Sequence, residues 1–119
     1  MDKDKIIQAR LASNKAIAIK DVDGVARFWM DDIVVISGEG GKHSGKKNLV
    51  KVWKQLFAAG VPLFERLTAE VIVAESGQLA WESGSWNYLD GASGGSYAAM
   101  WRKVNGLWLT RSELFVSLD

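Results

Sequence analysis

Apolar residues recur at helical spacing through most of the first half of the chain. They fall every three or four positions through residues 3–19, without glycine or proline, which predicts a helix. A second, shorter helix is expected to begin after Asp21, a good N-cap, and to be broken by Asp31-Asp32. A third amphipathic helix is predicted from about Asn48 to the next glycine. The expected buried positions of the three helices are Ile6, Ile7, Leu11, Ala12, Ala16 and Ile19; Val25, Phe28 and Trp29; and Leu49, Val50, Trp53, Leu56 and Phe57.

The second half alternates at strand spacing instead. Residues 63–74 and 79–89 are predicted strands, and residues 97–115 are predicted to form two more. The last two are joined by Asn105-Gly106, because both residues tolerate the positive φ of a two-residue hairpin turn. Together with a short strand at residues 33–36, this order predicts a single α+β domain spanning residues 1–119.

The predicted turn also assigns each residue of the terminal hairpin to a face. Pairing Val104 with Leu107 places Tyr97, Trp101 and Trp108 on one face. Met100, Leu109, Arg111 and Glu113 fall on the other face. Because neither face is purely polar, both are expected to be covered.

Composition narrows the class of protein. The 119 residues carry 15 Lys and Arg against 14 Asp and Glu, and 48% of them are hydrophobic, as in an ordinary globular domain. A balance this even does not suggest a nucleic-acid partner. No apolar run approaches the length of a membrane span, and the N-terminal residues lack the apolar core of a signal peptide. No membrane partner is therefore expected, and the location is predicted to be cytoplasmic.

Four stretches resemble the nuclear transport factor 2-like superfamily, which includes SnoaL-like proteins, ketosteroid isomerase and limonene-epoxide hydrolase. They are DVDGVARFWMDDIVVIS, the glycine-led helix from Gly45 to Phe57, LAWESGSWNY and YAAMWRKVNGLWLTRSELF. The resemblance, most specific to SnoaL-like domains, covers nearly the whole chain. It implies a cone-shaped, cystatin-like α+β barrel fold, in which three helices pack on a strongly curved, mainly antiparallel sheet and enclose a pocket.

The resemblance further implies which residues face that pocket. On residues 79–89 the inward set would be Ala80, Glu82, Gly84, Trp86 and Tyr88. The inward face of the hairpin would carry Met100, Leu109, Arg111 and Glu113, and Phe28, Trp53 and Phe57 would close the helical wall. A mostly apolar cavity with a few polar groups is typical of a small-molecule site. The expected ligand is a small apolar molecule, bound by Trp86, Tyr88, Met100, Phe28, Trp53 and Phe57.

The catalytic residues of two relatives are not matched. An ungapped comparison places Ser37, Ser13 and Met100 where ketosteroid isomerases have a general-base Asp, a Tyr and an acidic Asp. Of the acidic and basic triad of limonene-epoxide hydrolases, only Glu113 falls near an acid, while Gly84 and Trp86 occupy the other two positions.

The remaining catalytic hypothesis is a polar cluster of Glu82, Arg111 and Glu113 at the base of the pocket. Two carboxylates in one apolar cavity are expected to raise the pKa of one of them, which would suit a general acid or base. The alternative is that Arg111 and Glu113 form a structural ion pair or reach solvent. The resulting function is either an acid–base enzyme of isomerase, cyclase, dehydratase or epoxide hydrolase type, or a non-catalytic ligand-binding or association module.

The Gly/Lys-rich segment between the short strand and the third helix offers weaker candidates. His43, the only histidine, is expected to be a solvated loop residue at the mouth of the pocket. The stretch from Gly40 to Lys47 imitates a phosphate-binding loop but lacks the final Ser or Thr, so nucleotide hydrolysis is rejected. No metal site and no cofactor are predicted, because the chain has one His and no Cys.

The hairpin face opposite the predicted pocket suggests assembly. If Trp101 and Trp108 lie outside, together with Tyr97 and Trp81 they make a larger exposed apolar patch than a monomer usually carries. Many relatives pair through this surface of the sheet. A homodimer is therefore predicted, with Trp81, Tyr97, Trp101 and Trp108 at or near its interface.

Overall fold

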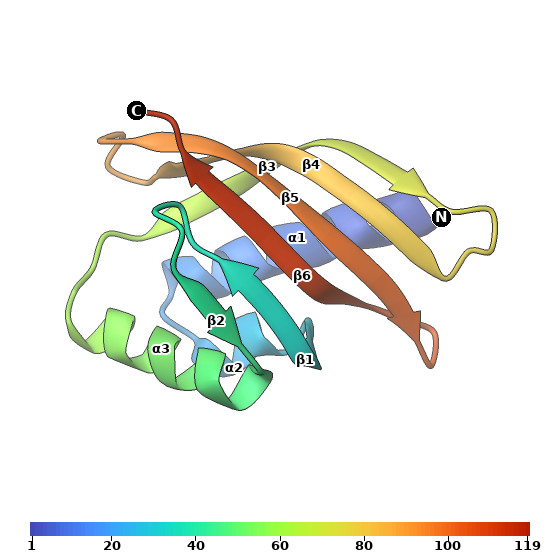
Figure 1. Ribbon diagram of the computed structural model, residues 1–119, viewed down its shortest axis with the longest axis horizontal. Coiled ribbons are helices and arrows are strands. Elements are labelled where there is room, and N and C mark those ends of the chain that lie inside the picture. The colour runs from blue at the N-terminus through green and yellow to red at the C-terminus, as the bar shows by residue number, and fades with distance from the viewer.

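A computed structural model describes all residues, 1–119, and has the predicted α+β architecture. The chain forms three helices and six strands. Two shorter strands lie between the second and third helices, and four longer strands follow the third helix (Figure 1). The elements are α1 (Asp2–Ala18), α2 (Val22–Ala26), β1 (Trp29–Ile36), β2 (Lys42–Ser44), α3 (Lys46–Ala58), β3 (Phe64–Val73), β4 (Leu79–Tyr88), β5 (Gly94–Val104) and β6 (Leu107–Ser117). No helix is both long and apolar enough to cross a membrane.

The six strands form one mixed sheet in the order β2-β1-β6-β5-β4-β3. All neighbours are antiparallel except β1 and β6, which run parallel. The sheet does not close into a barrel, because β2 and β3 are the two ends of this order and do not pair with each other. The sheet is therefore curved but open.

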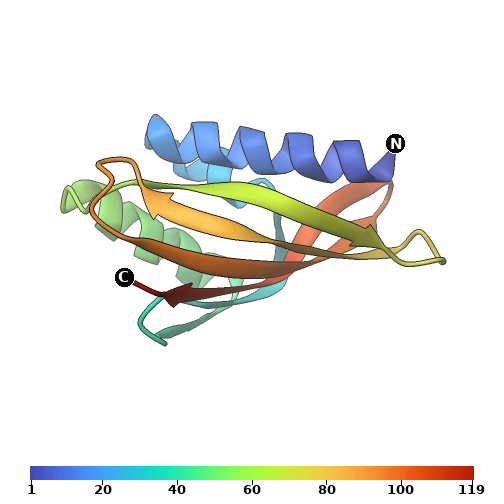
Figure 2. The ribbon, with the colours of Figure 1, turned by 90° about the horizontal axis from the view of Figure 1, so that it is seen from above.

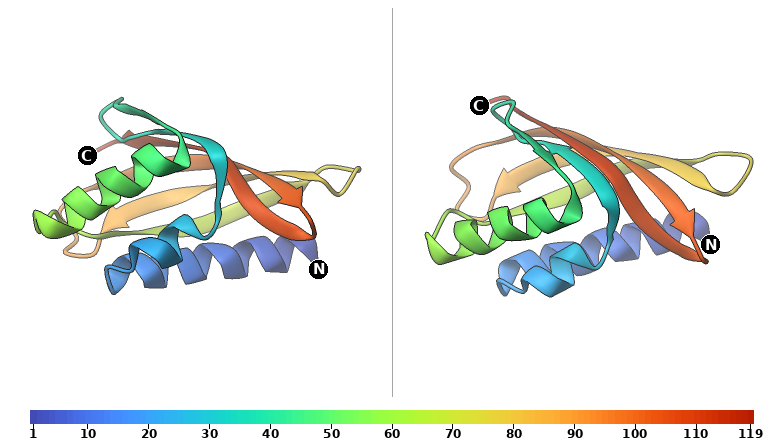
Figure 3. Two further views of the ribbon diagram at one scale, coloured as in Figure 1. Left: turned by 90° about the horizontal axis from the view of Figure 1, so that it is seen from below. Right: turned by 60° about the horizontal axis from the view of Figure 1, so that its bottom comes forward.

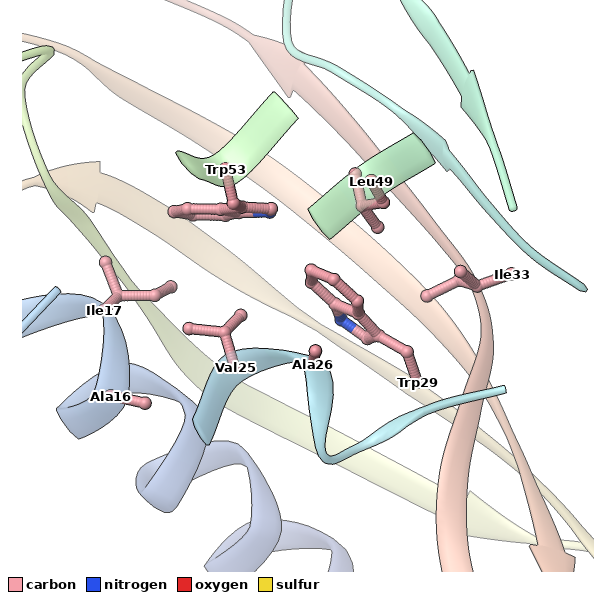
Figure 4. Packing of buried hydrophobic residues seen from close by; sticks show 8 residues of the cluster. All are labelled: Ala16, Ile17, Val25, Ala26, Trp29, Ile33, Leu49 and Trp53. Carbon is pink, nitrogen blue, oxygen red and sulfur yellow. The ribbon is translucent and has the colours of Figure 1, made fainter. Parts of the chain in front are cut away.

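The helices and the curved sheet enclose the core. Figure 2 shows α1 lying lengthwise along one face of the sheet, and Figure 3 shows the sheet bending around α3. One buried cluster joins the C-terminal part of α1 to α2, β1 and α3; Figure 4 shows Trp29 and Trp53 at its centre. A second cluster, which includes Ile6 and Trp101, fills the space between α1 and the long strands. The sheet's opposite, outer face carries no helix (Figure 2).

The second helix is shorter than the sequence pattern indicated. It ends at Ala26, and Trp29 already belongs to β1. Asp31 and Asp32 therefore do not break a helix; they are exposed residues inside a strand. The Asp21 side chain does cap α2, by accepting a hydrogen bond from the backbone N–H of Gly24 at 3.1 Å.

The terminal hairpin turns where predicted, but its faces change partway along. Asn105 and Gly106 have φ values of 52° and 80°, and Val104 pairs with Leu107. Farther from the turn, Trp101 pairs with Thr110 while Met100 pairs with Ser112, so Arg111 is an extra residue in β6. Such a β-bulge reverses which side chains of the bulged strand face each side of the sheet. Beyond it, Glu113 and Phe115 share the inner face with Ala99 and Tyr97.

Candidate functional site

Four charged side chains meet between α1 and the inner face of the sheet. They come from four elements: Arg10 from α1, Arg66 from β3, Glu82 from β4 and Glu113 from β6. Each is at most 4% exposed. Two positive and two negative charges balance, which is the condition under which charges are tolerated inside a protein. We call these four residues the charge network.

Arg10 lies between the two carboxylates. Its Nη2 is 2.7 Å from Oε1 of Glu82, and its Nη1 is 2.7 Å from Oε2 of Glu113. Its Nε donates to both oxygens of Glu82 at 3.1 Å. Burial alone would lower the pKa of Arg10, but the two carboxylates outweigh burial and raise it. Arg10 is therefore permanently charged and holds two strands against α1.

Glu82 has no free hydrogen-bonding capacity. Besides Arg10, its carboxylate accepts hydrogen bonds from Thr68 at 2.8 Å, from the indole of Trp101 at 2.9 Å and from the hydroxyl of Tyr97. Burial favours the neutral acid, but Arg10 and these donors outweigh burial and hold the pKa of Glu82 below its ordinary value. Of the two carboxylates expected to share a cavity, Glu82 is therefore not one whose pKa is raised, because Arg10 lies between the two acids.

Glu113 and Arg66 are less fully satisfied. Arg66 Nη1 lies 3.6 Å from Glu113 Oε2, an ion pair without a hydrogen bond. The rest of the Arg66 guanidinium donates to Ser13 and, at 3.0 Å, to Asn14. Burial, followed by the charge of Arg10, lowers the pKa of Arg66 to about 10. This half of the charge network is the part able to meet a further group.

The local sequence explains how these groups fit inside. The buried stripe of α1 consists of Ile6, Arg10, Ser13, Ala16 and Ile17, so two of its five positions are polar. On β4, a Cβ at Gly84 would lie 2.1 Å from the backbone oxygen of Leu67 and 2.9 Å from the Tyr97 ring. Only glycine leaves the space in which Tyr97 reaches Glu82.

The structure brings together two of the three predicted catalytic residues. Glu82 and Glu113 do meet inside the molecule, but the guanidinium between them belongs to Arg10. Arg111 lies at the bulge and points to the outer side, where it pairs with Asp32 at 3.4 Å in an exposed ion pair. The prediction that Arg111 joins the cluster was wrong, because the bulge turns its side chain away.

Most of the predicted interface residues are also placed differently. Tyr97, Trp101 and Trp108 are buried on the inner face, not exposed on the outer one. Trp108 packs under the start of α1 and its indole donates to Asp2 at 3.1 Å. This hydrogen bond is the main cause of the lowered pKa of Asp2. Trp81 alone lies on the outer face, where it is 44% exposed.

A separate cavity of about 240 Å³ lies between α3 and the adjoining ends of the strands. Its fifteen lining residues include eleven hydrophobic ones and no carboxylate. They are Ser37, Gly38, His43, Leu49, Val52, Trp53, Leu56, Phe57, Val61, Pro62, Leu63, Phe64, Trp86, Tyr88 and Phe115.

Four of the six predicted ligand-binding residues line this cavity, namely Trp53, Phe57, Trp86 and Tyr88. The other two do not. Met100 lies on the outer face beside the bulge, and Phe28 packs against the core beneath α1. His43, expected to be solvated, is half-buried and lines the cavity.

Aromatic rings separate the cavity from the charge network. The centroids of Phe64, Trp86 and Phe115 lie 6.0 to 6.4 Å from one another in edge-to-face contacts. On the side of the charge network, Phe64 packs against the guanidinium of Arg66, and Phe115 stacks on Tyr97. The cavity therefore suits an apolar molecule, while the charge network lies behind its inner wall.

Comparison with known proteins identifies the family of the chain. The model of the SnoaL-like domain family matches residues 6–112. The chain belongs to the SnoaL-like domain family. No curated protein matches the sequence.

Several solved structures share the fold of this chain. An NTF2-like protein of unknown function from Shewanella oneidensis is 18% identical, with both chains fully covered and a TM-score of 0.84. A ketosteroid isomerase-like protein from Erwinia carotovora atroseptica is 20% identical over 97% of this chain and 95% of its own, with a TM-score of 0.74. A protein of unknown function with a cystatin-like fold, from Nostoc punctiforme, is 14% identical over 99% and 92%, with a TM-score of 0.81. At these identities the likeness concerns the fold alone.

Proposed function

We propose that this SnoaL-like chain binds a small, largely apolar molecule in the cavity beside α3. The observation that carries the proposal is the lining of that cavity, in which aromatic and aliphatic side chains predominate and no carboxylate is present. Sites of this composition, with a few polar groups, are typical of small-molecule binding. An apolar cavity of about 150 Å³ already accepts benzene. The 240 Å³ here leave room for a second ring.

Filling the cavity tests this proposal. Val52→Phe adds a ring to the wall formed by α3, whereas Leu11→Phe adds the same ring to an exposed site on α1. Binding of one- and two-ring compounds, from toluene to 2-methylnaphthalene, is followed by NMR at the indole N–H of Trp53. We expect saturable binding to the unmodified protein and to Leu11→Phe, and none to Val52→Phe. Equal binding to Val52→Phe, or no binding of any compound, contradicts the proposal.

One observation favours acid–base catalysis as a second function. Glu113 Oε1 accepts no hydrogen bond, although no fully buried side-chain oxygen or nitrogen in the structure lacks a partner. This oxygen therefore has open space beside it, and Arg66 Nη1 lies 3.6 Å from the other carboxylate oxygen, Oε2. A carboxylate with one free oxygen is able to take a proton from a small molecule. The aromatic layer of Phe64, Trp86 and Phe115 would have to move to admit it.

Hydrogen exchange on a bound ligand distinguishes the two functions. In D₂O, a catalytic Glu113 would introduce deuterium at an acidic C–H of a ligand that binds in the cavity. Glu113→Gln should abolish this exchange, and Glu70→Gln, at an exposed carboxylate of β3, should not. If Glu113→Gln leaves the exchange rate unchanged, Glu113 is not the base. Exchange no faster than in the absence of the protein would instead favour a binding module.

We also propose that the SnoaL-like chain forms a homodimer through the outer face of the sheet. The register places Ile72, Trp81 and Met100 side by side across β3, β4 and β5. Ile72 and Trp81 are each about half exposed and form a continuous apolar strip. A monomer in sedimentation at micromolar concentration would contradict the proposal, as would an unchanged dimer in Trp81→Lys.

A further inference from the structure

The cavity has one polar end, formed by Ser37 and His43. We infer that the ligand is amphipathic, with a ring system in the cavity and a carboxylate held at the rim by Ser37 and His43. This inference rests on the proposed binding function and adds the chemical class of the ligand. Both residues are half-buried, whereas Leu49, Trp53 and Trp86, which also line the cavity, are buried. The two polar side chains therefore keep part of their surface in solvent.

The β1–β2 hairpin places these two side chains on the same face. Val35 pairs with His43, and the backbone N–H of Ser37 donates to the oxygen of Gly41 at 2.8 Å. Because side chains alternate along strands, residues 35, 37, 41 and 43 share one face. Val35 packs against the core, so this is the face that turns toward α3.

Gly41 leaves an empty position between the two polar groups. A Cβ there would lie 3.0 Å from Ser37 Oγ and 3.8 Å from His43 Nε2. Both polar atoms therefore border one point that no side chain fills. A ligand head group that contacts Gly41 from this side would lie within reach of both atoms.

Both side chains have a hydrogen to donate at that point. Ser37 Oγ accepts the backbone N–H of Gly41 at 3.0 Å, and its own hydroxyl makes no further hydrogen bond. Neither ring nitrogen of His43 makes a hydrogen bond within the protein, so Nε2 is free to donate one in the tautomer or charged form that carries its proton. Two convergent donors fit an oxygen acceptor. An ammonium group would find no carboxylate among the lining residues.

The charge of the adjacent helix favours an anion over a neutral acceptor. One wall of the cavity is formed by α3, which contains four lysines and no acidic residue. Lys42 adds a fifth positive charge on β2, and the one acid between residues 37 and 58 is Glu39. A carboxylate deep in an apolar cavity would lose its hydration without an ion partner. At the rim it keeps part of its hydration while the rings reach Trp53 and Trp86.

A pair of probes with the same rings tests this assignment. The probes are 2-naphthoate and 2-methylnaphthalene, titrated separately and followed by NMR at the Trp53 indole. A charged hydrogen bond changes affinity by roughly tenfold or more. We expect 2-naphthoate to bind at least tenfold more tightly than 2-methylnaphthalene. His43→Phe and Ser37→Ala should each remove most of that preference, measured in each variant as the ratio of the two affinities.

Two further variants exclude indirect effects. Ser44→Ala removes a hydroxyl from the next, exposed position of β2 and should change neither affinity. His43→Gln keeps a donor and should retain more of the preference than His43→Phe. Equal binding of both probes, or a preference that survives His43→Phe and Ser37→Ala, overturns the carboxylate assignment and leaves the proposed apolar binding intact. Failure of both probes to bind contradicts the proposed function itself.

Discussion

Replacing Arg10 with methionine should destabilise the protein strongly at neutral pH. Methionine fills a similar space but donates no hydrogen bond, so Glu82 and Glu113 lose the guanidinium that lies 2.7 Å from each. Breaking a buried ion pair by removing one partner costs about 3–5 kcal/mol. Glu82 retains its three neutral donors, and Arg66 Nη1 remains 3.6 Å from Glu113, which partly offsets the loss. We therefore expect a loss of about 3 kcal/mol in the free energy of unfolding.

The pH dependence should identify the cause. In the native protein the pKa of Glu82 is lowered, so its stabilising effect is present above the unfolded carboxyl pKa of about 4.3 and is lost as the pH falls through the folded value. Without Arg10, burial dominates and favours the protonated acid. The variant should therefore gain stability relative to the native protein as the pH decreases. The difference between the two should be largest at pH 7 and smaller near pH 4.5.

Urea unfolding followed by tryptophan fluorescence measures both effects, because Trp101 is buried against the charge network. Arg111→Met is the matched control, since its exposed ion pair should contribute less than about 1 kcal/mol. A loss below 1 kcal/mol for Arg10→Met, or a loss independent of pH, would show that the charge network does not hold α1 on the sheet. Adding Glu82→Gln to Arg10→Met should recover part of the stability.

Two further substitutions test the packing around the charge network. Gly84→Ala should strongly destabilise the fold or prevent folding, because its Cβ would lie 2.1 Å from the backbone oxygen of Leu67. Urea unfolding measures the effect, and a loss below about 1 kcal/mol in the free energy of unfolding would contradict this prediction. Tyr97→Phe should reduce the free energy of unfolding by about 1.5–3 kcal/mol, because it removes a hydrogen bond to the charged Glu82. An unchanged urea midpoint for Tyr97→Phe would show that the other donors compensate.

The sequence by itself determined the elements whose cause is local. The Asn105-Gly106 turn follows from two residues that accept positive φ, and α3 follows from its regular apolar stripe. The inward direction of Glu82 was also predictable, because no bulge interrupts the alternation of β4 against β5.

Only the tertiary structure decided which residues of the terminal hairpin face the core and which charged side chains form ion pairs. The alternation of side chains along a strand predicts which face each residue occupies only while the pairing register is unbroken. In β6 the extra residue Arg111 breaks that register. Nothing in the local pattern of β6 distinguishes a bulge from a regular strand.

Arg10 was missed for a different reason. A hydrophobic pattern identifies buried positions by their apolar residues, whereas α1 buries an arginine whose partners lie 72 and 103 residues away in the chain. Its burial is favourable only because those two carboxylates meet it in the folded chain.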